Sequence, residues 1–269
     1  MSIAFLGGGN MANALIGGLI ARGYPAGDIA VIEISPAARE RIAAHGVRVS
    51  RAPDAASAKA DTLVLAVKPQ DARAALAAIA RSVHGKLVIS IAAGLRLAAL
   101  SRWLGGHRQL VRCMPNTPAL VGAGIAGLYA LPEVTPAERE RAQRILGAVG
   151  EVVWLDDERL LDTVTAVSGS GPAYVFWLIE QLAQFAEQAG IGKGEALQLA
   201  THTVLGSAKL AAQSGEPPAE LRARVTSKGG TTEAALRVFE QEKLAERFAR
   251  ALAAAAKRGG ELGDELARD

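Results

Sequence analysis

The sequence predicts an α/β domain followed by an all-α domain. Short apolar runs typical of buried parallel strands alternate with helical segments as far as about residue 155. A glycine-rich turn joins the first of these strands to the first helix. No convincing strand follows residue 156, so we place the domain boundary there and expect domains of residues 1–157 and 158–269.

The composition indicates a folded protein with a sizeable aliphatic core. Of the 269 residues, 50% are hydrophobic and only 4% aromatic, so the core must consist mainly of Ala, Leu, Val and Ile. The net charge is +3, and the 30 basic residues are interspersed with 27 acidic ones. Because no basic stripe exists, nucleic acid is not an expected partner, whereas anionic small molecules suit the mild positive charge.

Cysteine, histidine and hydropathy patterns exclude several classes of protein. Cys113 is the single cysteine, so no internal disulfide can form, and we expect it to be a packed core residue. The N-terminal segment resembles a strand rather than a secretory signal, and no apolar run reaches the roughly eighteen residues of a membrane span. A cytoplasmic location without membrane association is therefore expected. The four histidines show no pairing pattern, and no metal site is expected: His45, His84, His107 and His202.

The first nineteen residues carry the strongest motif. The apolar run Ile3–Leu6 is followed by G-x-G-x-x-A at Gly7, Gly9 and Ala12, and a helix begins near Asn10. Gly7 permits a tight turn, Gly9 lets a pyrophosphate approach the backbone, and Ala12 lets the helix pack close to the strand. Helix N–H groups and the helix dipole then face the anion, so we predict a Rossmann-type dinucleotide site rather than an unrelated glycine-rich turn. The expected cofactor contacts here are Gly7, Gly8, Gly9, Asn10, Met11 and Ala12.

The end of the second strand bears on the choice of cofactor. Ile29–Ile32 is followed by Glu33, at the spacing where an acidic residue bonds the ribose hydroxyls of a dinucleotide and repels a 2′-phosphate. Arg39, Arg41 and Arg51 follow, and any of them could instead bind a 2′-phosphate. Glu33 could also be a solvated charge at the strand end. The cofactor is therefore NADPH or NADH, with NADH favoured by Glu33.

Three later strand ends are expected to lie beside the cofactor. The apolar strand from Thr62 to Val67 ends in Lys68 and Pro69, and Lys68 either touches the pyrophosphate or ribose or is a solvated charge. The strand Leu87–Ile91 is followed by small residues that let the chain pass close to a nicotinamide. The strand Leu110–Met114 runs into a stiff loop that can present polar side chains. The further cofactor contacts that we predict are Ala66, Val67, Lys68, Pro69, Ala92, Ala93 and Asn116.

The second domain opens with a long apolar helix, from Ala173 to about Gln188. Its apolar side chains lie on more than one face: Val175, Phe176, Trp177, Leu178, Ile179, Leu182 and Phe185. A helix that is apolar on all sides is normally buried, and a domain of this size can scarcely bury it alone. We therefore expect a dimer interface; the alternative is a central helix within one monomer.

A second candidate site lies at Thr226–Glu233, where a helix begins. Two glycines and four hydroxyl side chains precede or open this helix. Its backbone N–H groups, its dipole and the hydroxyls favour a small carboxylate. The alternative is ordinary capping of the helix by Thr231 or Thr232.

Four stretches together resemble the pyrroline-5-carboxylate reductase family, and they occur in that family's order over nearly the whole chain. The last stretch, a pair of segments, is far more specific than the first, which many dehydrogenases share. The stretches are Phe5–Ala12, Ala66–Gln70, Met114–Pro118, and the pair Val167–Tyr174 with Val225–Thr232.

The resemblance implies an activity and an assembly. The family reduces 1-pyrroline-5-carboxylate to L-proline with NAD(P)H, the last step of proline biosynthesis. It implies a Rossmann domain, a helical domain that interlocks with its twin in a homodimer, and in some members a decamer of five dimers. It also implies a nicotinamide near Asn116 and Ala92–Ala93. One departure is that Glu33–Ser35 lacks the basic residue of some NADPH-preferring members.

The substrate that the resemblance implies can be reduced without a strong acid supplied by the protein. A cyclic imine protonated at nitrogen is already electrophilic, so catalysis should come from positioning and electrostatics. We expect backbone N–H groups of Gly229, Gly230 and Thr231 to hold the substrate carboxylate. Thr232 or Ser227, as the catalytic candidates, would bond the ring nitrogen or the carboxylate. Ser168 and Ser170 would shape the helix start that contacts the substrate.

Two other functions compete with this interpretation. A β-hydroxyacid dehydrogenase has a similar plan, but that family carries a catalytic lysine on the long helix, and Pro172–Trp177 contains none. A non-enzymatic dinucleotide sensor would keep Gly7 and Gly9 without needing the segment Ser227–Thr232. Such a protein would bind the cofactor without turnover.

Overall fold

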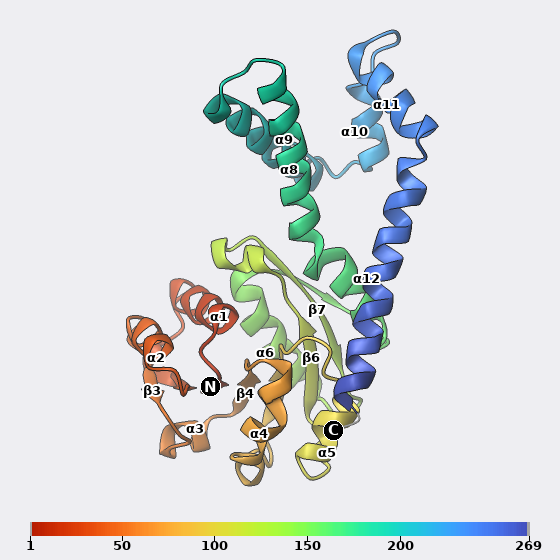
Figure 1. Ribbon diagram of the computed structural model, residues 1–269. Coiled ribbons are helices and arrows are strands. Elements are labelled where there is room, and N and C mark those ends of the chain that lie inside the picture. Colours follow the sequence, from red (N-terminus) through yellow and green to blue (C-terminus); the bar gives the residue numbers. More distant parts are fainter. Residues whose placement is uncertain (1, 268–269) are drawn as a thin grey trace. The chain divides into compact units, whose positions relative to one another are not determined.

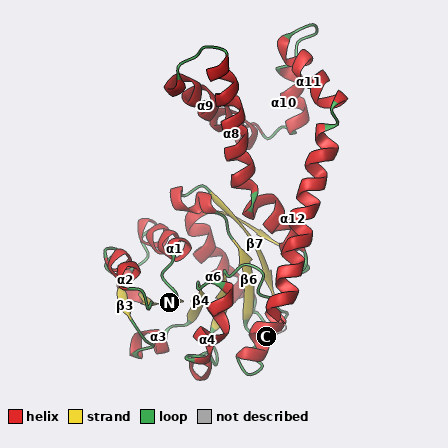
Figure 2. Ribbon diagram, viewed as in Figure 1, coloured by secondary structure: helices red, strands yellow, loops and turns green. Residues whose placement is uncertain are grey.

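The computed structural model describes residues 2–267, which form two compact units (Figure 1). The first unit contains residues up to Ser170 together with those from Ala255 onward, and the second contains residues 171–254. Every strand of the described chain belongs to the first unit, whereas the second is helical (yellow and red in Figure 2). The predicted α/β domain and all-α domain are therefore confirmed.

The first unit is built on one eight-stranded sheet with the order β3-β2-β1-β4-β5-β6-β7-β8. All neighbours are parallel except β6 and β7, which are antiparallel. Chain order reverses between β1 and β4, and in open α/β sheets ligands bind outside the carboxyl ends of the strands at this point. The strands are β1 (Ile3–Leu6), β2 (Ile29–Ile32), β3 (Arg48–Ser50), β4 (Thr62–Leu65), β5 (Leu87–Ser90), β6 (Leu110–Met114), β7 (Gly124–Ala130) and β8 (Gly150–Trp154).

Helices cover both faces of this sheet. Phe5, Val64 and Ile89 belong to a core that includes residues of α1, α2 and α6, whereas Leu65 and Val88 face a second core with α4 and α5. Since successive strand residues point to opposite faces, both faces are buried, as the continuous apolar runs predict. The helices are α1 (Asn10–Ala21), α2 (Pro36–Ala43), α3 (Ala55–Lys59), α4 (Ala72–Ala77), α5 (Leu97–Trp103), α6 (Pro136–Leu146) and α7 (Leu160–Val164), and the π-helix Thr165–Gly169 follows α7.

The second unit contains α8 to α11 and the first half of α12. Helices α8 and α9 pack side by side, yet Ala183 is the buried residue of α8. Phe176, Trp177 and Phe185 are 60%, 58% and 72% exposed in the single chain. The helices are α8 (Gly171–Gln188), α9 (Lys193–Ser214), α10 (Pro218–Arg224), α11 (Thr231–Gln241) and α12 (Leu244–Ala267).

The division between the units differs from the boundary expected at residue 157. Helix α7 packs on the sheet: Leu161 is fully buried, and a Cβ at Gly127 of β7 would lie 2.9 Å from the methyl groups of Val164. The first unit therefore continues to Ser170. Helix α12 extends to Ala267, and its residues from Ala255 onward belong to the first unit. Within residues 2–267 the structure has no helix that is long and apolar enough to cross a membrane.

Candidate functional site

The turn between β1 and α1 needs glycine at its first position. Gly7 has a φ of +103°, and a Cβ there would lie 2.7 Å from the Ala66 carbonyl oxygen and 2.9 Å from Val67 Cγ1. Its N–H donates to the Ile32 carbonyl at 2.8 Å, so the turn is held between β2 and the end of β4. The predicted residues Gly7, Ala66 and Val67 are thus in contact at the β1/β4 switch point.

Helix α1 begins at this turn without a side-chain cap. Gly9 is its N-cap residue, and a Cβ at Gly9 would have its nearest neighbour only at 4.0 Å. Ala12 is fully buried against the sheet, as the motif predicts. The first-turn N–H groups, which include those of Asn10 and Met11, have no carbonyl partner within the helix. This helix start therefore offers donors and a positive dipole end to an anion.

Glu33 lies beside the glycine turn and is bonded to it. Its Oε2 accepts from the Gly8 N–H at 2.6 Å, and its Oε1 accepts from the Ser35 N–H at 2.7 Å. Arg41 donates to the Gly8 carbonyl at 3.1 Å, whereas Arg39 donates to the carbonyls of residues 33 and 34. Both arginines thus bind backbone oxygens, and Glu33 is the acidic group closest to the turn.

Two further strand ends lie at the same edge of the sheet. After β4, Lys68 is exposed, and Pro69 opens the 3₁₀ turn Pro69–Asp71. After β5, Ala92 is buried and Ala93 is exposed. Because β1, β4 and β5 are adjacent and parallel, the carboxyl ends of these strands share one edge. The structure therefore brings these predicted residues to the edge that carries the glycine turn.

Asn116 has a positional role that the sequence analysis did not predict. Its side chain is buried, its Nδ2 donates to the Ser168 carbonyl at 3.2 Å, and its Oδ1 accepts from the Ile125 N–H at 3.0 Å. The amide thus joins the loop after β6 to the π-helix that contains Ser168. Ser168 Oγ donates to the Val164 carbonyl at 3.0 Å, and Ser170 ends the first unit.

The segment Ser227–Thr232 belongs to the second unit. Gly230 is the N-cap residue of α11 and no side chain caps this helix, so capping by Thr231 or Thr232 does not occur. The Gly229 N–H donates to Glu233 Oε2 at 2.6 Å. The loop therefore already binds a carboxylate oxygen, supplied by its own helix.

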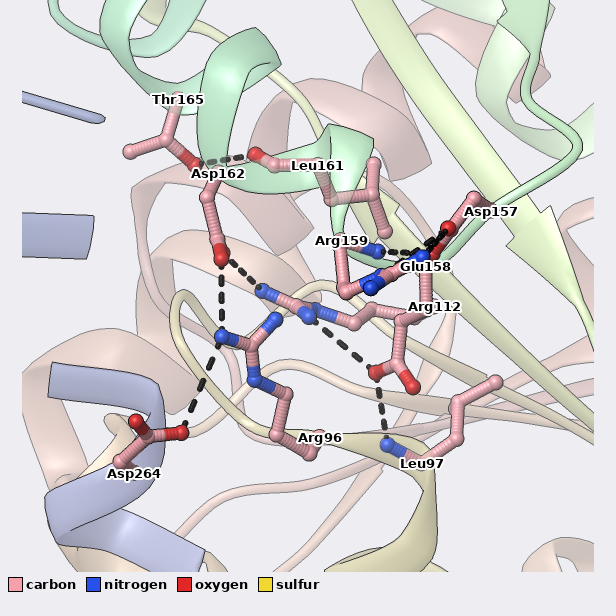
Figure 3. Close-up of polar contacts among 10 residues, drawn as sticks. All are labelled: Arg96, Leu97, Arg112, Asp157, Glu158, Arg159, Leu161, Asp162, Thr165 and Asp264. Atoms are coloured by element: carbon pink, nitrogen blue, oxygen red, sulfur yellow. Dashed lines mark hydrogen bonds and ion pairs between the residues drawn. The ribbon is translucent and has the colours of Figure 1, made fainter. Parts of the chain in front are cut away.

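One cluster of charged side chains was not predicted from the sequence. Arg112 of β6 is 3% exposed and pairs with Glu158 and Asp162, and Arg96 pairs with Asp162 as well (Figure 3). A sequence signal existed: Arg112 interrupts an otherwise apolar strand, and a buried arginine needs acidic partners. The partners themselves lie far along the chain.

Cys113 and His107 are buried, whereas His84 and His202 are exposed. Cys113 is 1% exposed, and burial raises the pKa of its thiol, so it is a protonated core residue. His107 is buried, and His45 Nε2 lies 3.0 Å from Asn13 Oδ1. Across residues 2–267, no three side chains of His, Cys, Asp or Glu are grouped to hold a metal ion.

Family models match both parts of the chain. Residues 158–262 match the model described as pyrroline-5-carboxylate reductase dimerisation. Residues 2–94 match the model described as NADP oxidoreductase, coenzyme F420-dependent. The glycine turn, Glu33 and the strand ends after β4 and β5 lie within the second match.

Relatives match over nearly the whole length. A pyrroline-5-carboxylate reductase of Pseudomonas aeruginosa is 46% identical and covers 98% of this chain and 97% of its own. The solved pyrroline-5-carboxylate reductase of Coxiella burnetii is 40% identical with a TM-score of 0.93, covering 97% of this chain and 98% of its own. A Plasmodium falciparum pyrroline carboxylate reductase solved with NADP bound is 27% identical, with a TM-score of 0.86 and 98% of each chain covered. The chain belongs to the pyrroline-5-carboxylate reductase family.

Proposed function

We propose that this chain reduces 1-pyrroline-5-carboxylate to L-proline with a reduced nicotinamide dinucleotide, the last step of proline biosynthesis. The observation that carries the proposal is the glycine turn at the β1/β4 switch point, where Gly7 has a positive φ, in a chain whose near full-length relatives are named for this reaction. The single cysteine suits the reducing conditions of the cytoplasm, where we place the enzyme.

The first unit holds the dinucleotide in this proposal. The first-turn N–H groups of α1 bind the pyrophosphate, beside the turn at Gly7, Gly8 and Gly9. Glu33 binds the ribose hydroxyls, and its negative charge favours NADH over NADPH. When bound, the reduced nicotinamide supplies a hydride to the C=N carbon of the substrate. Further contacts come from the strand ends: Ala66, Val67, Lys68, Pro69, Ala92 and Ala93, with Asn116 holding its loop in place.

The second unit holds the substrate carboxylate. Gly229, Gly230 and Thr231 offer backbone N–H groups at the start of α11, where the Gly229 N–H donates to Glu233. The substrate carboxylate takes the place of the Glu233 oxygen there. Thr232 or Ser227 bonds the ring nitrogen or the carboxylate, and because the ring nitrogen is already protonated, no strong protein acid is needed.

The working enzyme is a homodimer that covers the exposed apolar side chains of α8. Trp177 and Leu178 of α8 also line an apolar cavity of about 750 Å³ with Phe239 and Phe248. An unpaired apolar surface of this kind marks an association site. Five such dimers would form the decamer known in the family.

The absorbance of the reduced nicotinamide, followed with purified protein and 1-pyrroline-5-carboxylate, tests the proposal. We expect a decrease that depends on the imine and is faster with NADH than with NADPH. A faster decrease with NADPH would contradict the role of Glu33 but not the reaction. No turnover by folded protein that binds a cofactor would favour the sensor interpretation, and oxidation of a β-hydroxyacid with NAD⁺ would favour the hydroxyacid dehydrogenase.

A further inference from the structure

Two arginines and two carboxylates of the first unit form a cluster in which Arg112 is buried and the other three side chains are partly buried (Figure 3). Arg112 donates from Nη1 to Glu158 Oε1 at 3.1 Å and from Nη2 to Asp162 Oδ1 at 3.4 Å. Arg96 Nη2 donates to Asp162 Oδ2 at 2.8 Å. The exposed fractions are 3% for Arg112, 14% for Asp162 and 17% for Arg96. Asp162 thus joins the two arginines, with one oxygen on each.

This set of ion pairs holds three elements in a fixed relation. Arg112 lies on β6, Asp162 lies on α7, and Arg96 is the N-cap residue of α5. Glu158 Oε1 also accepts from the N–H of Leu97, the first residue of α5, at 2.8 Å. Buried charge pairs need not add stability, but they are directional, and removing one partner leaves an uncompensated charge.

The C-terminal half of α12 lies directly against the cluster. A Cβ at Gly263 would lie 2.8 Å from Arg96 Nε and 3.1 Å from the Gly94 carbonyl oxygen. A Cβ at Gly259 would lie 3.8 Å from atoms of Asp162. Glycine at these positions lets α12 approach both the arginine and the loop after β5.

The same residues border a cavity of about 340 Å³ at the carboxyl edge of β4 and β5. Its walls include Gln70 after β4 and Gly94 after β5, and Leu262 and Leu266 of α12. Asp162 is part of both the ion pairs and the cavity wall. The cavity is therefore formed by elements whose positions depend on the charged cluster.

We infer that Asp162 is a positioning residue that shapes the cavity for the nicotinamide half of the cofactor. This inference rests on the proposed function. Asp162 sets the position of α12 and of the loop after β5 through Arg96. Through Arg112, it fixes α7, to which it belongs, against the sheet. The adenosine half binds elsewhere, at the Gly7 turn and Glu33, so the two halves of the cofactor depend on Asp162 to different degrees.

The test compares, by isothermal titration calorimetry, a whole dinucleotide with ADP-ribose, which is the same molecule without its nicotinamide ring. Asp162→Asn keeps the size of the side chain but removes its charge. We expect NADH to bind about tenfold more weakly, while ADP-ribose binds within about twofold of wild type. The matched control is Asp264→Asn, because Asp264 lies 4.0 Å from Arg96 but is 71% exposed, and it should change neither affinity. If wild type prefers NADPH, then NADPH and 2′-phospho-ADP-ribose replace these two ligands.

Equal weakening of both ligands, or no change in either, would overturn the inference in favour of a merely structural ion pair. If Asp162→Asn does not fold, Gly263→Ala tests the same inference, because its Cβ displaces Arg96 or α12 without removing a charge. Gly263→Ala should also bind NADH more weakly while its affinity for ADP-ribose stays near that of wild type. If it binds both ligands as tightly as wild type does, the inference is overturned. Binding is measured without the imine, so failure here is distinguishable from absence of reductase activity.

Discussion

At the scale of single residues, Gly7 gives the sharpest prediction. Gly7→Ala places a Cβ 2.7 Å from a backbone oxygen at a φ of +103°, so the turn must distort. We expect a loss of about 2 kcal/mol or more in unfolding free energy, and dinucleotide binding too weak to detect. The control Gly27→Ala has an ordinary φ and no neighbour within 4 Å, so it should be neutral. Urea unfolding and calorimetry measure both effects, and normal binding by Gly7→Ala would contradict this account.

Glu33 is expected to determine the preference for NADH over NADPH. In Glu33→Gln the negative charge beside the ribose site is lost, while the side-chain oxygen can still accept from the Gly8 N–H. We expect the ratio of kcat/KM for NADH to that for NADPH to fall about tenfold, which corresponds to about 1.4 kcal/mol. Glu40→Gln, on the exposed side of α2, removes the same charge and should leave the ratio unchanged. An unchanged ratio in Glu33→Gln would show that Glu33 does not select the cofactor.

At the scale of elements, His107 couples the start of β5 to the segment before β6. Its Nε2 lies 2.9 Å from the Lys86 carbonyl oxygen, and burial lowers the pKa of the imidazole below 6.5. Below pH 6.5 the His107 imidazole is protonated in the unfolded chain but stays neutral in the folded chain until the pH reaches its lower pKa there. The free energy of unfolding should therefore fall as the pH decreases from 6.5 toward that lower pKa. Urea midpoints at several pH values measure this dependence. His107→Gln should flatten it, whereas the same change at exposed His202 of α9 should not.

The elements also show which features a sequence can predict. The strands β1, β2, β4 and β5 follow from apolar runs, and the α6 capping box follows from Thr135 and Glu138, which bond each other's backbone. Helix α3 was missed because five residues without apolar periodicity carry no pattern. Helix α12 continues through Gly259 and Gly260 to Ala267, because packing within the first unit overrides the helix-breaking tendency of glycine there.

The polar contacts of the candidate site were harder to predict than its backbone. Gly7 and Ala12 occupy the positions that their motif predicts, because the motif is local and its reasons are steric. The pairing of Arg112 with Asp162 joins residues 50 positions apart, and no local pattern specifies it. The acceptor of the Asn116 amide is likewise a backbone carbonyl far along the chain. Such contacts depend on the tertiary arrangement and not on spacing.

At the scale of the whole molecule, the exposed apolar residues of α8 predict a dependence of assembly on Trp177. This side chain is 58% exposed in one chain and lines the apolar cavity of the second unit. A buried tryptophan at an interface typically contributes about 2 kcal/mol or more, and a glutamate in its place would bury an unpaired charge. Trp177→Glu should therefore dissociate the assembly.

Light scattering on purified protein measures this outcome. Wild type should have a mass of at least twice the 27.8 kDa of one chain, and Trp177→Glu should approach 27.8 kDa while keeping its helical circular dichroism. Gln188→Glu adds the same charge at the exposed end of α8 and should keep the wild-type mass. A tenfold wild-type mass would establish the decamer. A wild-type mass of 27.8 kDa would refute the homodimer. If Trp177→Glu keeps the wild-type mass, the interface does not include this side chain.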